Sequence, residues 1–181
     1  MSSRKTADTT HAPGAWSSSA AQQVVTAYVR ELQSALRLSD WEILVDMTRQ
    51  WEFEEEFARI EAPTNQKRAT IVISRMFWEQ DTAQMRHALV HELVHCHLFA
   101  VHHQAEFVFE DTLKPKAAMI AGRAVLNEVE KSTDAMADVL CTLLPPMPDP
   151  RDAVEAAVEP EARTSTRAGR KSRSKRHLHV A

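Results

Sequence analysis

The chain has 181 residues, of which 44% are hydrophobic and 26% are charged, so it is long enough to form one globular domain with a core. Only 3 glycines occur and no GxGxxG or GxxxxGK[ST] pattern is present, which argues against a Gly-rich nucleotide-binding loop. The N-terminus lacks an apolar signal segment, and no apolar run reaches the roughly 18–20 residues of a membrane helix. Because Cys96 and Cys141 form no CxxC or disulfide framework, we expect a soluble protein of the reducing cytoplasm.

The net charge of −3 is unevenly distributed along the chain. Residues 163–181 carry seven Lys or Arg side chains and no acid, so residues 1–162 together carry −10. The basic run 163–177 can contact nucleic-acid phosphates non-specifically, bind the acidic part of the chain, or only aid solubility.

The first half of the chain predicts one helix and two short strands. Residues 1–18 are rich in Ser and Thr and are expected to be disordered. Apolar side chains recur at helical spacing over 19–38, which predicts an amphipathic helix. The alternation in 41–47 and the β-branched run 68–74 predict strands. Residues 49–67 between them are compatible with a ragged strand, a short helix or a loop.

The second half predicts two helices. Residues 82–102 contain no Gly or Pro and are apolar on most sides, as in a buried helix that Asp81 or Thr82 caps. The segment 102–116 is expected to be an exposed connection, and a long helix is expected over 117–144. The proline-rich residues after it end this helix.

These elements predict an α+β fold with one domain over residues 19–145. We expect disordered segments on both sides of it, at 1–18 and 146–181, with the second one basic from residue 163.

The stretch HALVHELVH contains the motif HExxH at residues 91–95. On a helix, His91 and His95 lie four residues apart on one face, so both imidazoles can reach one zinc ion. Glu92 then projects beside the water that the ion activates and can accept its proton. Two imidazoles and a carboxylate on an apolar helix are costly to bury without partners, and a metal ion would offset that cost.

A third zinc ligand is expected in the last helix. Glu130 lies on a mostly apolar stripe of that helix, whereas Glu128 has more polar neighbours, so Glu130 is the better candidate. Asp134 follows one turn later and can accept an N–H from a ligating histidine.

HExxH on one helix with ExxxD on a later helix resembles the gluzincin arrangement of zinc peptidases. The order of elements over residues 22–144 is similar to that of small metallopeptidases of bacteriophages and actinobacteria. The resemblance implies a minimal zincin-like core: an N-terminal helix, a small sheet of short strands, the HExxH helix and a long C-terminal helix. It also implies that His91, His95 and Glu130 bind zinc, that Glu92 is the general base, and that a phage protein would act in the host cytoplasm.

The sequence departs from larger gluzincins because it offers no clear counterpart of their oxyanion-stabilising His or Tyr. Tyr28 is the only tyrosine and is expected to pack in the first helix. A metzincin motif would need Gly at position 98 and His at position 101, where this sequence has Leu98 and Val101. A SprT-like arrangement would take its third ligand from His102 or His103.

Other residues near the motif are expected to be structural. His87 is either a ring near the cleft or, more simply, a capping or surface residue, while His97 points away from the zinc face and Cys96 is a small buried side chain. The strand segment TIVIS, 70–74, is either an edge strand that receives a peptide or an ordinary core strand. The residues Trp41, Trp51 and Trp78 are expected to anchor the core and its rim.

The sequence therefore predicts a zinc-dependent metallopeptidase that acts on a peptide or protein substrate. Three alternatives remain open at this point: a non-catalytic, zinc-stabilised interaction module, a SprT-like DNA-associated protease with a histidine as third ligand, and a helical domain without metal.

Overall fold

The computed structural model of the protein describes residues 19–49, 56–63 and 66–156. The chain divides into two compact units, residues 25–148 and residues 1–24 with 149–181. The described part of the second unit includes a short helix over 150–156. The N-terminal segment 1–18 and the basic run 163–177 lie outside the described residues, as does Trp51.

The fold of the larger unit is α+β, as predicted. Helix α1 (Ser19–Ala35) buries the side chains of Val25, Tyr28 and Leu32, which recur at helical spacing. It ends at Arg37, whose φ of 60° is left-handed. The N–H groups of Arg37 and Leu38 donate to carbonyls of the last turn, so the helix ends in a Schellman motif.

Three strands form one sheet in the order β1-β3-β2. Strand β1 (Glu42–Asp46) pairs parallel with β3 (Arg68–Ile73), and β2 (Ala58–Glu61) pairs antiparallel with β3. The segment TIVIS thus belongs to the central strand. The prediction of a core strand is confirmed, and the alternative prediction of an edge strand is wrong. Its β-branched side chains are largely buried, which suits a strand paired on both sides. Among the described strands, β2 pairs only with β3, and β2 is the strand that packs against α2.

Helix α2 (Thr82–Thr112) follows the short 3-10 helix η2 (Met76–Glu79). Asp81 caps α2 in a capping box with Gln84, which confirms one of the two predicted caps. The helix is ten residues longer than predicted, so residues 103–112 are helical and not a loop. They contain no Gly or Pro, and the break comes only where Pro115 disfavours helix at the residue before it.

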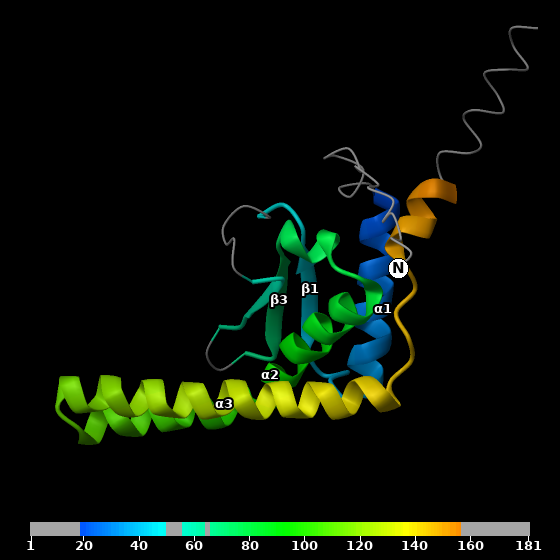
Figure 1. Cartoon of the computed structure of the whole chain (residues 1–181). Coiled ribbons are helices and arrows are strands. Elements are labelled where there is room, and N and C mark those ends of the chain that lie inside the picture. Colours follow the sequence, from blue (N-terminus) through cyan, green and yellow to red (C-terminus); the bar gives the residue numbers. More distant parts are fainter. Residues whose placement is uncertain (1–18, 50–55, 64–65, 157–181) are drawn as a thin grey trace, which may run out of the picture. The chain divides into compact units, whose positions relative to one another are not determined.

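Helix α3 (Pro115–Leu143) starts directly after this turn, with Pro115 in its first turn, and packs against α2. Figure 1 shows α3 lying alongside α2. Two small side chains, Thr133 and Ala137, are the buried residues of α3, so the backbones of the two helices can approach closely. None of the described helices has an apolar stretch long enough to cross a membrane.

The two halves of α2 differ in their surroundings. From Met85 to Cys96 most apolar side chains are buried, and this half packs on β2. After Cys96 no residue of α2, which is described throughout, is buried. The motif HExxH thus lies in the anchored half of the helix, at the border of the core.

Candidate metal centre

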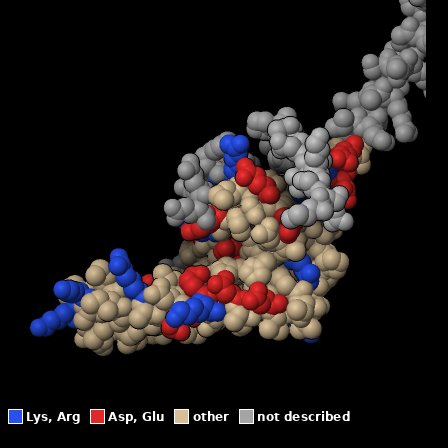
Figure 2. Space-filling model, in the orientation of Figure 1, with Lys and Arg blue, Asp and Glu red and all other residues tan. Residues whose placement is uncertain are grey.

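Histidines of α2 face carboxylates of α3 at three successive turns. Both series step by four residues, and they run in opposite directions along the two helices: His87, His91 and His95 on α2, and Asp138, Asp134 and Glu130 on α3. Figure 2 shows acidic side chains gathered along the C-terminal half of α3. The spacing of four keeps each series on one face, so antiparallel packing brings the series together.

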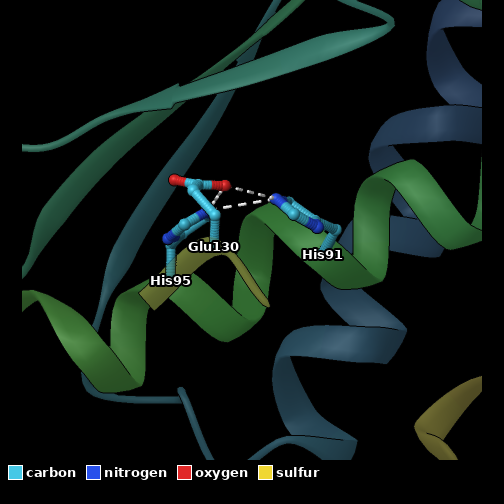
Figure 3. Close-up of side chains that lie close together, drawn as sticks. All are labelled: His91, His95 and Glu130. Atoms are coloured by element: carbon cyan, nitrogen blue, oxygen red, sulfur yellow. Dashed lines mark hydrogen bonds and ion pairs between the residues drawn. The ribbon is translucent and has the colours of Figure 1, made fainter. Parts of the chain in front are cut away.

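At one end of this series, Glu130 lies near two histidines at once. We define His91, His95 and Glu130 as the interhelical cluster. The Nε2 atoms of the two histidines lie 3.1 Å apart. The Oε2 atom of Glu130 lies 3.4 Å from Nε2 of His91 and 3.5 Å from Nε2 of His95. In Figure 3 the carboxylate of Glu130 reaches from α3 to both imidazole rings.

These separations fit a tetrahedral zinc site. Zinc binds imidazole nitrogen and carboxylate oxygen at about 2.0–2.2 Å, which places neighbouring ligand atoms of a tetrahedron about 3.4 Å apart. All three separations lie close to that value, and two nitrogens with one oxygen leave a fourth position open. The donor set therefore suits zinc, and the three side chains need little movement to bind it.

Asp134 lies on the other side of the His91 ring. Its Oδ1 is 2.9 Å from Nδ1 of His91, an ion-pair contact that favours the ring proton on Nδ1 and an unprotonated Nε2 facing His95 and Glu130. His87 makes a similar contact one turn earlier, with 3.1 Å between its Nε2 and Oδ1 of Asp138. The sequence analysis did not predict the pair of His87 with Asp138, although the spacing of four residues in both helices could have indicated it.

Glu92 is held between α2 and the sheet. Its Oε2 accepts a hydrogen bond of 2.8 Å from the backbone N–H of Ile60 in β2. Burial raises the pKa of Glu92 to about 8, the charge of Glu130 adds to this, and the Ile60 N–H opposes it. Ile60 was not predictable as a partner, because its contribution is a backbone group of a strand with little sequence signal.

The cluster opens into a cavity of about 500 Å³ between β2, α2 and α3. Its walls include Glu92, the apolar side chains of Leu98 and Phe99, and the ion pair of Arg59 with Glu56. Burial lowers the pKa of His95, which favours the neutral imidazole that a metal requires. The cavity thus joins the three ligand atoms, a buried carboxylate and a strand edge.

Several residues singled out in the sequence lie elsewhere. His102 and His103 form a separate group with Glu106 and not with His91 and His95. Glu128 is 71% exposed and pairs with Lys131.

Tyr28 and His97 also lie away from the three ligand atoms. The Tyr28 hydroxyl donates to the carbonyl of Pro145, and Nε2 of His97 contacts the carbonyl of Leu36. Cys96 is buried, as expected, and so is Trp78. Neither Tyr28 nor His97 is among the residues that line the cavity.

Comparison of the chain with protein-family models, with curated proteins and with solved structures finds no significant match in any of the three. The functional interpretation of the site therefore depends on its geometry and chemistry.

Proposed function

We propose that this protein is a zinc-dependent metallopeptidase of a gluzincin-like type, with His91, His95 and Glu130 as zinc ligands and Glu92 as general base. The observation that carries the proposal is the convergence of three ligand atoms from two helices, at tetrahedral separations, beside a buried carboxylate in one cavity. The resemblance in motif order that the sequence suggests supports the same assignment.

Zinc bound there would acidify a water molecule and polarise a peptide carbonyl. Glu92 would take the proton of the attacking water and pass it to the nitrogen of the leaving amine. The hydrogen bond from Ile60 fixes one oxygen of Glu92, so the side chain is held at the cavity wall. The Asp134 carboxylate, 2.9 Å from Nδ1 of His91, would favour the tautomer that presents Nε2 to the ion.

The cavity walls fit an extended peptide. In an antiparallel pair, residues outside the hydrogen-bonded pairs direct their backbone groups away from the neighbouring strand. Ala58 and Ile60 occupy such positions in β2, and both line the cavity. Because the Ile60 N–H donates to Glu92, a peptide would pair with the other outward backbone groups of these two residues. A peptide lying along this edge would pass the ligand atoms and Glu92.

The proposal is tested first by metal content. We expect one tightly held zinc per chain after dialysis of the wild type and a large loss of it in Glu130→Gln. Glu128→Gln, which removes an exposed carboxylate of the same helix, is the matched control and should keep the ion. Equal zinc in all three proteins would remove Glu130 from the ligand set.

Activity is tested with Glu92→Gln. The variant should keep its zinc and lose peptide hydrolysis by roughly 100- to 10,000-fold, the range that one general base contributes. Screening a peptide library by mass spectrometry measures this loss with many candidate substrates at once. Hydrolysis that persists at the wild-type rate in Glu92→Gln would contradict the assigned role.

A second candidate is a non-catalytic module in which zinc only joins the helices. It is favoured by one observation: Tyr28, the only tyrosine, is bonded to the carbonyl of Pro145, so it does not supply an oxyanion-stabilising hydroxyl at the cavity. This candidate predicts that zinc removal destabilises the domain while no peptide is cut by the zinc-loaded wild type.

A further inference from the structure

A second group of metal-binding side chains lies further along α2. We define the one-helix cluster as His102, His103 and Glu106, which each offer one ligand atom within 4.8 Å of the others. The Glu106 carboxylate is shared: Oε1 lies 3.5 Å from Nε2 of His102, and Oε2 lies 3.4 Å from Nδ1 of His103. Each carboxylate oxygen thus lies near one imidazole nitrogen, and an ion placed among the three groups would need modest side-chain rotation to reach all of them.

The state of His102 adds an independent observation. Its Nε2 atom is enclosed, and among the described residues it has no hydrogen-bond partner. Enclosed polar atoms are normally satisfied, and an unsatisfied one points to a water molecule or an ion that completes the site. The contact with Glu106 is an ion-pair distance without hydrogen-bond geometry, so it leaves this nitrogen available.

The rings are also held in place by stacking. Phe99 stacks on His103 with 5.9 Å between ring centroids and an interplanar angle of 19°, and on its other side it stacks on His95. His102 lines the same cavity as Glu92 and Glu130. His103 and Glu106 do not line this cavity, so of the one-helix cluster only His102 faces the interhelical cluster across it.

From these contacts we infer that His102, His103 and Glu106 bind a second divalent transition-metal ion, distinct from the ion at His91, His95 and Glu130. Two imidazoles and one carboxylate favour zinc, cobalt, nickel or copper over magnesium and calcium, which prefer all-oxygen sites. Water would fill the remaining positions, because α2 offers no further ligand from this turn. The inference does not depend on peptidase activity.

The test is the stoichiometry of metal uptake by the untagged full-length protein. Metal-free protein is titrated with Zn²⁺, and in parallel with Co²⁺, whose visible absorption reports ligand type. We expect two ions per chain for the wild type and one for the double variant His102→Ala/His103→Ala. The reciprocal variant, His95→Ala/Glu130→Gln, should also retain one ion.

Two controls make the result decisive. His177→Ala/His179→Ala removes two histidines of the tail and should leave both ions bound. Glu106→Gln, at a half-buried position, keeps both imidazoles and should lower the affinity for the second ion. Circular dichroism verifies that the variant is folded. Uptake of only one ion by the wild type would overturn the inference, and so would a second ion that survives in His102→Ala/His103→Ala.

A third outcome is also informative. If the histidine double variant loses the tightly held ion that Glu130→Gln retains, these histidines belong to the first site and no second site exists. That result would overturn both the inference and the ligand set of the proposed function. Absence of peptide hydrolysis with two ions bound would contradict only the peptidase assignment.

Discussion

The two clusters of α2 contain the same donor groups, two imidazoles and one carboxylate, but they are built differently. The interhelical cluster takes its carboxylate from α3 and lies where α2 is anchored to the sheet. The one-helix cluster takes all three side chains from one stretch of α2 that has no buried residue. An ion in the first cluster holds two elements together, whereas an ion in the second bridges groups that the helix already keeps adjacent. The groups of the second cluster lie within five residues of one another, so the unfolded chain can bind an ion there in part, and metal binding should be coupled to folding more strongly at the first cluster than at the second.

The largest expected effect is on global stability. Zinc present at a thousandfold excess over its dissociation constant stabilises a folded protein by about 4 kcal/mol, provided the unfolded chain does not bind it. His95→Ala/Glu130→Gln should lose most of that increment in urea unfolding with zinc present. His102→Ala/His103→Ala should lose less, because binding of an ion to these neighbouring side chains in the unfolded chain would offset part of the increment. Equal losses in the two variants would remove the distinction between the clusters.

The rate at which the buried thiol of Cys96 is alkylated also distinguishes the two clusters. Cys96 lies on α2 next to His95 and is 5% exposed, and burial raises the pKa of its thiol to about 12. In a Cys141→Ser background, alkylation at pH 8 should be slow and should proceed through opening of the structure. Chelation of the interhelical ion should accelerate it by up to about 1000-fold, the rate equivalent of the stabilisation above. Mass spectrometry measures the labelling, and His102→Ala/His103→Ala should not change it.

The spacing of the helices is tested with Ala137→Leu. Ala137 is fully buried between α3 and α2, so the larger side chain should push the helices apart at a cost of about 1–3 kcal/mol. Zinc affinity should fall at the interhelical cluster and stay unchanged at the one-helix cluster, as measured by calorimetric titration. Ala117→Leu, at an exposed position of α3, is the control. A uniform fall at both clusters would show that the substitution acts through general unfolding.

The smallest effect is expected for Asp134→Asn. Loss of the charge beside Nδ1 of His91 should weaken zinc binding at the interhelical cluster by roughly tenfold. Asp138→Asn removes the matching carboxylate one turn away, which contacts His87 and no ligand of the cluster, and should leave the affinity within about twofold. Competition with a zinc indicator resolves this difference. Equal weakening by both substitutions would indicate a general electrostatic effect of α3.

The helices and the central strand were predictable because their patterns are local. The helical stripe over 19–38, the capping residue Asp81 and the β-branched run in β3 each carry a signal within a few residues. The short strand β2 was not predictable, since its four residues acquire their pairing from β3. The predicted length of α2 is too short because the polar and aromatic residues after His102 are also typical of an exposed loop.

The site was predictable where one helix decides the geometry. The step of four places His91 and His95 on one face, and the apolar stripe of the last helix distinguishes Glu130 from Glu128. Contacts between elements could not be derived in this way. The hydrogen bond from Ile60 to Glu92 depends on packing that no local pattern encodes. The separation of the second histidine pair from the first cluster follows from the continuation of α2 beyond His102, which the sequence pattern did not predict.

The stepwise pairing of α2 with α3 also determines which changes in length the hairpin tolerates. Leu113 and Lys114 join the two helices, so the partner of each histidine depends on its distance from this turn. One residue inserted in α3 before Glu130 would rotate the carboxylates by about 100° relative to that turn and shift them by about 1.5 Å. Seven residues added to both helices would leave each face within about 20° of its original direction. The hairpin is therefore expected to accept insertions only as matched pairs of whole helical turns, a rule that can guide the grafting of new segments onto its tip.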